Sequence, residues 1–321
     1  MQQGLLIGID GGGTHSTAVA AWPDGRIAAV AHGGGLNYHN IGVDTVRRRL
    51  QDMVQELCEK AGAPLHRVCV GMSALDGPAD EQTHALFTSD LITREQLDLQ
   101  SDAYIALMGF TRGEPGMIVI CGTGSMLLLR DEAGAQHVSG GWGYLLGDTG
   151  SGYTLAREGL IAAIDATEGL GCPTVLESLA CRYFGTSTLR QTIDCIYAPD
   201  FTPDRMAGFA RHVIQAADDG DTAASDVLQS NMNRLARQTV CLLEKAPAAR
   251  RVGLYGGIFA HSEKAQACFT HTLRALAPRA KICALEYTPE LGAIIHLMQK
   301  EGLLSQERLS LLKQSYEEHL R

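Results

Sequence analysis

Short hydrophobic runs alternate along this chain with longer stretches in which hydrophobic residues recur every three or four positions. The short runs predict buried strands. We expect strands at residues 5–9, 68–72, 97–100, 117–120, 251–255 and 282–285. The longer stretches predict helices. We expect these at residues 43–61, 103–110, 153–166, 173–184, 203–217, 222–243, 264–276, 291–300 and 306–319. Because strands and helices alternate, the pattern indicates an α/β fold.

Two turns with glycine at the tip, at residues 23–25 and 131–134, predict β-hairpins. Moving the first unit along the chain by 109 positions aligns it with the second without a gap. Ile9 then meets Ile118, Gly13 meets Gly122, Thr14 meets Thr123 and Gly25 meets Gly134. The match predicts a duplicated domain, with chance similarity of two glycine-rich hairpins as the alternative. We place the domains at residues 1–114 and 115–321, with the last helices docking back on the first domain.

Composition narrows the classes of protein. The 321 residues suffice for two domains, and 45% are apolar and 20% charged, as in globular proteins. The net charge of −9 argues against a general nucleic-acid binder, whose affinity comes from phosphate contacts. No run of 18 apolar residues predicts a membrane span, and the N-terminus does not resemble a signal peptide.

The nine cysteines are odd in number, and no two have the spacing C-x-x-C. They are typical of reduced thiols in a cytoplasmic protein. No cysteine and histidine cluster has the spacing of zinc ligands, so we expect no zinc site.

Residues 8–17, GIDGGGTHST, and 121–125, CGTGS, are glycine-rich turns. Each presents backbone N–H groups and a threonine hydroxyl that can surround phosphate oxygens, because glycine permits close approach. A tight hairpin turn is the alternative for either one alone. Neither matches the P-loop pattern or leads directly into a helix, which disfavours a P-loop or dinucleotide site. Two such turns facing each other would form a clamp on a polyphosphate.

Two aspartates follow predicted strands. A carboxylate at Asp10 would repel phosphates unless a cation intervened, and Mg²⁺ is the obvious candidate. A turn aspartate that bonds its own backbone is the alternative. Asp102 starts a helix, so it is either an N-cap or a general base that accepts a proton from a hydroxyl.

Two loops offer polar groups to a small ligand. Residues 35–40, GLNYHN, carry amides that suit sugar hydroxyls and equally suit a surface turn. Residues 140–158, GGWGYLLGDTGSGYTLARE, place six glycines around Trp142 and Asp148 just before a helix.

Five segments, in this order, carry a family resemblance: GIDGGGT, SDAYIAL, CGTGS, GGWGYLLGDTGSGY and GLYGGIF. They resemble the N-acetylglucosamine kinase family, within the BadF/BadG/BcrA/BcrD ATPase group of the actin-like and sugar-kinase superfamily. The resemblance spans residues 5–295, and GGWGYLLGDTGS is its most specific part. It implies two duplicated ribonuclease-H-like domains with ATP in the interdomain cleft.

The resemblance also implies residue roles. ATP phosphates would contact Gly11, Gly12, Gly13, Thr14, Gly122, Thr123, Gly124 and Ser125, while Asp10 would position Mg²⁺. Gly256, Gly257 and Ala217 would border the adenosine. The sugar site would be lined by Asn37, Gly141, Trp142, Gly143 and Asp148. Asp148 would accept hydrogen bonds from sugar hydroxyls, and Asp102 would be the base.

The chain lacks the zinc cluster of the ROK sugar kinases and a cysteine pair for an iron–sulfur cluster. Cys121 occupies the phosphate turn without an evident role. The leading hypothesis is an ATP-dependent kinase for the 6-hydroxyl of an amino sugar, with N-acetylglucosamine first, then glucosamine and N-acetylmuramic acid. An ATPase that switches a partner protein and a non-catalytic sugar sensor are the alternatives. Since relatives are often dimers, we expect a homodimer, although no patch of residues in the sequence identifies an interface.

Overall fold

The computed structural model describes residues 4–75 and 77–320, which divide into two units. The first unit contains the residues up to Glu114 and those from Ala284 onward, and the second unit is Pro115–Cys283. The sequence-based prediction placed residues 115–321 in the second domain, with the last helices docking back on the first. The structure instead ends that unit at Cys283, and the last two helices, α14 (Pro289–Lys300) and α15 (Gln306–His319), belong to the first unit.

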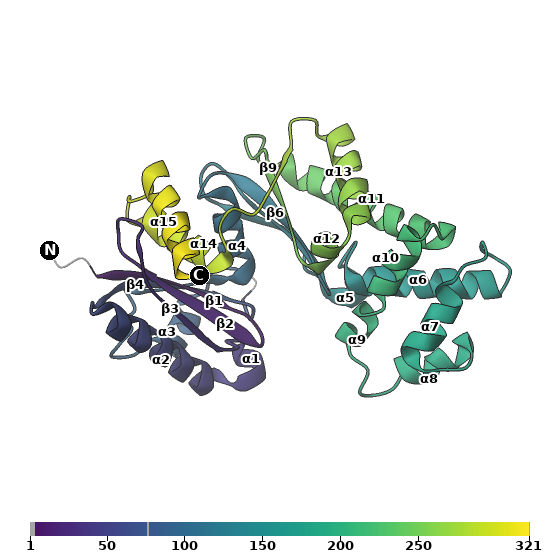
Figure 1. The fold of residues 1–321 in the computed structure, drawn as a ribbon, viewed down its shortest axis with the longest axis horizontal. Helices are drawn as coiled ribbons and strands as arrows, with labels where there is room; N and C mark the ends of the chain where they lie inside the picture. Colours follow the sequence, from purple (N-terminus) through teal and green to yellow (C-terminus); the bar gives the residue numbers. More distant parts are fainter. Residues whose placement is uncertain (1–3, 76, 321) are drawn as a thin grey trace. The chain divides into compact units, whose positions relative to one another are not determined.

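The first unit is built on a five-stranded sheet in the order β3-β2-β1-β4-β5 (Figure 1). Its strands are β1 (Leu5–Gly11), β2 (His15–Ala21), β3 (Ile27–Gly34), β4 (Leu65–Met72) and β5 (Leu97–Ser101). The first three strands form an antiparallel meander, and β1, β4 and β5 run parallel. Because parallel strands end at the same edge, the residues that follow β1, β4 and β5 gather there.

The second unit repeats this topology in the order β8-β7-β6-β9-β10. Its strands are β6 (Gly116–Cys121), β7 (Ser125–Arg130), β8 (Gln136–Gly140), β9 (Arg251–Tyr255) and β10 (Lys281–Cys283). Again three strands form an antiparallel meander and three run parallel. The predicted α/β fold with a duplicated sheet is therefore confirmed.

Helices cover both faces of the first sheet (Figure 1). On one face lie α1 (Tyr38–Ile41), α2 (Val43–Ala61) and α3 (Glu81–Phe87), and α2 buries the predicted row Val46, Leu50, Met53, Val54 and Leu57. On the other face, α14 packs on β1 and on α4 (Asp102–Thr111). Every residue of α4 from Ala103 to Thr111 is buried.

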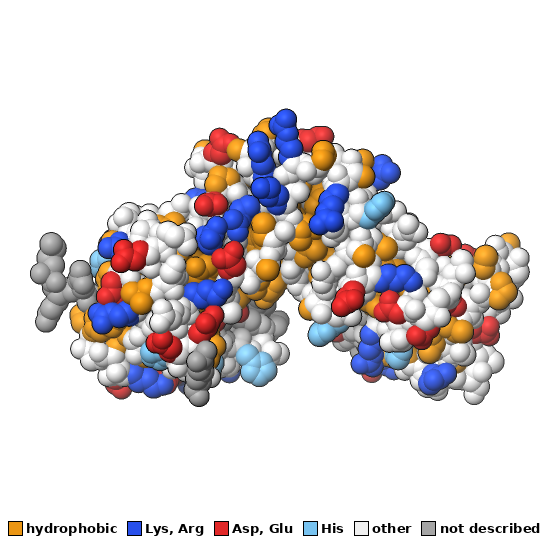
Figure 2. Space-filling view, turned by 45° about the horizontal axis from the view of Figure 1, so that its top comes forward, with side chains coloured by type: hydrophobic (Ala, Val, Ile, Leu, Met, Phe, Trp, Pro, Cys, Tyr) orange, Lys and Arg blue, Asp and Glu red, His pale blue; other side chains and the backbone are white. Residues whose placement is uncertain are grey.

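The second unit carries more helices. They are α5 (Gly143–Leu146), α6 (Gly152–Thr167), α7 (Leu176–Phe184), η1 (Leu189–Gln191), α8 (Thr192–Ile196), α9 (Pro203–Ala207), α10 (Ala210–Asp218), α11 (Thr222–Leu243), α12 (Gly257–His261) and α13 (Glu263–Leu276). They enclose a hydrophobic core with the sheet. Charged side chains of both signs are visible on the surface of each unit in Figure 2.

Two predicted helices differ in extent. The helix expected over 173–184 begins only at Leu176, because Asp221 accepts hydrogen bonds from the Thr174 hydroxyl and the Val175 N–H before it. The helix expected over 203–217 is broken at Gly208 into α9 and α10. The hydroxyl of Tyr183 occupies the space where a Cβ at Gly208 would lie.

Candidate functional site

The first unit brings four predicted site residues to the edge where β1, β4 and β5 end. Asp10 lies on β1 opposite Gly71, and Met72 lies opposite Ser101, which Asp102 follows. The turn after β1 contains Thr14, which is exposed. Asn37 lies in the loop that packs on this turn, because the Leu36 N–H donates to the Gly12 carbonyl at 2.9 Å.

Close packing of glycines fixes that loop. A Cβ on Gly35 would collide with the carbonyl oxygen of Gly13, so the loop can approach the turn only without a side chain. Arg49 of α2 donates to the Gly35 carbonyl at 2.6 Å. Asn37 caps α1, and its Oδ1 accepts from the His39 N–H at 3.1 Å.

The carboxyl group of Asp10 lies in a partly buried and negatively charged environment. Burial first, and then the carboxylates of Glu290 and Asp102, raise the pKa of Asp10 to about 6. A divalent cation beside Asp10 would relieve this excess of negative charge, and carboxylate oxygens are the ligands that Mg²⁺ prefers. Mg²⁺ commonly keeps several waters and uses one or two carboxylates, so the chemistry of this edge fits it.

Asp102 is the first residue of α4 rather than its N-cap. The cap is Ser101, whose Oγ accepts from the Tyr104 N–H at 3.2 Å. The Oδ1 atom of Asp102 accepts from the Ala103 N–H at 2.7 Å. The capping alternative is therefore wrong for Asp102, and its carboxylate sits half-buried at the edge of the sheet.

The second unit folds its glycine-rich loop around the turn at residues 122–125. The Gly152 N–H donates to the Gly122 carbonyl at 2.7 Å, and the Tyr153 N–H donates to the Thr123 carbonyl at 3.1 Å. The Ser125 hydroxyl donates to the Thr149 carbonyl at 2.8 Å. The predicted phosphate turn and the predicted sugar loop are thus one connected structure.

Asp148 lies at the centre of this structure. Its side chain is buried, its Oδ1 accepts from the Ser125 N–H at 3.2 Å, and a Cβ on Gly124 would lie 2.8 Å from its Oδ2. Burial raises the pKa of Asp148. The N-cap of α6 is Ser151, whose Oγ accepts from the Thr154 N–H, so Asp148 does not cap this helix.

Cys121 has a packing role that the sequence did not reveal. Its thiol donates to the Gly150 carbonyl at 3.0 Å, which ties the end of β6 to the loop. Burial and then the Asp148 carboxylate raise the pKa of Cys121 to about 12, so the group stays a thiol at neutral pH.

The short helix α5 and Trp142, the residue before it, expose large apolar side chains. Trp142 is 75% exposed, Leu145 74% and Leu146 85%, next to the exposed glycines Gly141 and Gly143. Gly140, Gly141 and Gly143 all have positive φ, as does Asp148. Trp142 therefore presents its ring to solvent, while Asp148 of the same loop is buried.

The residues predicted to border adenosine lie on neighbouring elements. Gly256 follows the end of β9 and has a φ of +103°, and Gly257 begins α12. Ala217 is buried near the end of α10, and its carbonyl accepts from the Lys264 ammonium of α13. Lys264 also donates to the Ser225 hydroxyl at 3.2 Å, so it joins α10, α11 and α13.

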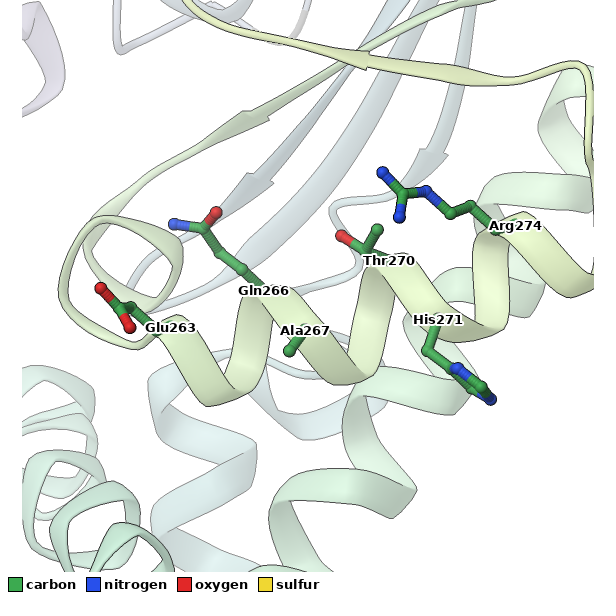
Figure 3. Close-up of a pocket in the computed structure, with 6 residues that line it drawn as sticks. All are labelled: Glu263, Gln266, Ala267, Thr270, His271 and Arg274. Atoms are coloured by element: carbon green, nitrogen blue, oxygen red, sulfur yellow. The ribbon is translucent and has the colours of Figure 1, made fainter.

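A cavity of about 610 Å³ lies along an outer face of α13 (Figure 3). It is lined by Glu263, Gln266, Ala267, Thr270, His271 and Arg274. None of the predicted site residues lines it, so it plays no part in the site.

Sequence reasoning missed three residues beside the predicted sites. Glu290 is buried against the Asp10 edge and accepts from the hydroxyls of Thr288 and Tyr316, both at 2.5 Å. Lys264 holds the Ala217 carbonyl, and Asp204 accepts from the Thr123 hydroxyl at 3.0 Å. No spacing signal marks these residues, because the interactions that bring them to Asp10, Ala217 and Thr123 join elements far apart in the chain.

The duplicated sheets, each with a glycine–threonine turn after its first strand, define an α/β fold of the ATPase type. The chain belongs to the BadF/BadG/BcrA/BcrD ATPase family, whose model matches residues 7–296. This agrees with the resemblance found in its motifs.

Named relatives cover most of the chain. An N-acetylmuramic acid/N-acetylglucosamine kinase of Clostridium acetobutylicum is 27% identical over 296 residues, 90% of this chain and 97% of the relative. An N-acetyl-D-glucosamine kinase of Dictyostelium discoideum is 27% identical over 248 residues, 73% of this chain and 78% of the relative. A crystal structure from Chromobacterium violaceum, of a candidate N-acetylglucosamine kinase, has a TM-score of 0.69 at 25% identity and covers 93% of this chain and 100% of that one.

Within residues 4–75 and 77–320 no helix combines the length and apolar character needed to cross a membrane. No three or more histidine, cysteine, aspartate or glutamate side chains in these ranges are arranged to hold a metal ion.

Proposed function

We propose that this protein is an ATP-dependent kinase that phosphorylates the 6-hydroxyl of an amino sugar, with N-acetylglucosamine as the first candidate substrate. The observation that carries the proposal is the edge of the first sheet, where Asp10, the Thr14 turn and Asp102 lie at the ends of parallel strands. The names of the relatives support the substrate class.

Each residue has a task in this proposal. Asp102 accepts the proton of the attacking sugar hydroxyl. Thr14, Thr123, Ser125 and their glycines hold ATP phosphates through N–H and hydroxyl donors, because phosphoryl transfer depends mainly on positioning and charge neutralisation. Asp10 would hold Mg²⁺, which supplies positive charge beside the phosphates when it is bound.

The sugar contacts are assigned to the polar loops. Asn37 has its Oδ1 engaged by the His39 N–H, which leaves its amide nitrogen as the group to donate to a sugar oxygen. Asp148 accepts sugar hydroxyl hydrogen bonds, and the exposed Trp142 ring, with Gly141 and Gly143, lines the ligand. Gly256, Gly257 and Ala217 border the adenosine.

An ADP-release assay over a panel of hexosamines tests the proposal. We expect ADP release with N-acetylglucosamine, glucosamine or N-acetylmuramic acid, and none with the matched 6-deoxy sugar, which lacks the accepting hydroxyl. ADP release that does not depend on sugar would indicate a partner-switching ATPase instead. Sugar binding without any ADP release would indicate a sensor.

A further inference from the structure

The two threonines that the internal repeat aligns have different hydrogen-bond partners. Thr14 Oγ1 lies 2.9 Å from Nδ1 of His15, its neighbour in the first turn. Thr123 Oγ1 donates to Oδ1 of Asp204 at 3.0 Å, across 81 positions of the chain. The duplicated turn is therefore alike in backbone and different in what its hydroxyl meets.

The difference decides where the hydroxyl proton can go. A threonine hydroxyl has one proton, and an ionised carboxylate can only accept, so the proton of Thr123 points at Asp204. A histidine ring nitrogen can donate or accept. The proton of Thr14 is consequently available to another acceptor when His15 Nδ1 donates.

Phosphate oxygens, like carboxylate oxygens, accept hydrogen bonds. A phosphate at the second turn must therefore take the proton of Thr123 away from Asp204. It must also approach a second negative charge, which repels it. Asp204 and a phosphate thus compete for the same donor.

Asp204 is held at this position by the packing of α9. Thr202 caps that helix by accepting from the Arg205 N–H at 3.3 Å, and Pro203 starts it. α9 packs on α6, where a Cβ on Gly152 would lie 3.4 Å from the Cβ of Ala207. The Gly152 N–H in turn donates to the Gly122 carbonyl, so α9 and the turn are fixed to the same helix start.

We propose that Asp204 is a positioning residue that competes with a nucleotide phosphate for the Thr123 hydroxyl and so lowers the affinity of the second turn for nucleotides. The inference rests on the proposed function, because it takes ATP or ADP to be the ligand of that turn. Lower affinity for ADP would favour release of the product, a step that limits turnover in many enzymes.

Calorimetric titration of the full chain with ADP, with and without Mg²⁺, tests the inference. In Asp204→Asn the amide donates to Thr123 Oγ1 and frees its proton, so we expect the Kd for ADP to fall about 2- to 10-fold. The matched control is Asp200→Asn, which removes one exposed charge from the segment just before α9 and leaves Asp204 and Thr123 in place. Its Kd should equal that of the wild type.

Thr123→Val completes a double-mutant cycle. It should weaken ADP binding in the wild-type background, and Asp204→Asn should then produce a smaller gain, because the charge repulsion is relieved but there is no hydroxyl proton to free. Thermal melts of all variants identify any loss of folding.

The outcomes separate the two proposals. If the wild type does not bind ADP, or if Thr123→Val binds ADP as tightly as the wild type, both the proposed role of the second turn and this inference are contradicted. Weaker binding in Thr123→Val, combined with no tightening in Asp204→Asn, overturns this inference alone. Equal tightening in Asp200→Asn overturns it as well, because the effect would then be a general one of charge.

Discussion

Asp98 of β5 and His296 of α14 meet at 3.0 Å although they are 198 positions apart in the chain. The same carboxylate oxygen, Oδ2, also accepts from the Lys300 ammonium at 2.8 Å, and the Gln100 amide donates to Oδ1 at 3.0 Å. The Tyr104 hydroxyl lies 3.2 Å from Nδ1 of His296. This network fastens the strand that precedes Asp102 to the helix that starts beside Asp10.

Removing the Asp98 charge should therefore destabilise the first unit. Burial raises the pKa of Asp98, but the hydrogen bond and charge of His296, with hydrogen bonds from Lys300 and Gln100, outweigh it and hold the pKa well below its usual range. We expect Asp98→Asn to lower the free energy of unfolding at pH 7 by about 2–4 kcal/mol. Urea denaturation of the two proteins measures the difference.

The pH dependence supplies the control. A group with a depressed folded pKa stabilises the protein above its unfolded value of about 3.9, and this contribution is lost as the pH falls through the folded pKa. The gap between wild type and Asp98→Asn should narrow when the pH is lowered below about 4. A gap that is constant with pH would show that the carboxylate charge is not the cause.

The adjacent glycines Gly256 and Gly257 should respond differently to alanine. Gly256 has a φ of +103°, and a Cβ there would lie 2.5 Å from the Cys121 carbonyl oxygen. Gly256→Ala should cost about 1–3 kcal/mol of stability, measured by denaturation.

Gly257→Ala is the matched control for stability. Gly257 is exposed, and its nearest neighbour to an added Cβ is His261 at 4.0 Å. Its stability should stay within about 0.5 kcal/mol of wild type. If Gly257 borders adenosine, the affinity of the Gly257→Ala variant for ATP should nevertheless fall. An unchanged affinity for ATP would contradict that assignment.

The sheets could be predicted because each buried strand is a short apolar run, and the repeat of 109 positions exposed the duplication. The turns followed from glycines that permit close backbone contacts, as at Gly35. Contacts between side chains that are far apart in the chain could not be predicted. Periodicity shows which face of α14 is apolar, but not that His296 meets Asp98 or that Glu290 lies beside Asp10.

Short helices were the other limit. The pattern over 203–217 reads as one helix, whereas Gly208 divides it and thereby places Asp204 beside Thr123. Asp148 was expected to face a ligand, and no sequence signal indicated that its carboxylate also accepts from the Ser125 N–H. Such contacts depend on the path of the loop, which glycine-rich sequences leave open.

Two substitutions at Asp148 should separate its tasks. Asp148→Asn keeps an oxygen that can accept from the Ser125 N–H but loses the charge, so sugar affinity should fall roughly 10- to 150-fold while ATP affinity barely changes. Asp148→Ala removes both carboxylate oxygens and should weaken the binding of both the sugar and ATP. Calorimetric titration with each ligand measures this, and equal losses for both ligands in Asp148→Asn would make Asp148 a structural residue only.

The role of Asp102 as the base can be tested without disturbing the helix that it begins. Because Ser101 provides the cap and an asparagine oxygen can still accept from the Ala103 N–H, Asp102→Asn should fold and bind ATP as the wild type does. Its turnover should fall by about 10²–10⁴-fold, since the amide cannot accept the hydroxyl proton.

Ser101→Ala is the converse control. It should lower the free energy of unfolding by about 1 kcal/mol and leave turnover within about threefold of wild type. Loss of folding in Asp102→Asn would make the residue structural. Turnover within about threefold of wild type in Asp102→Asn would refute the base, and catalysis would then rest on positioning of the phosphates alone.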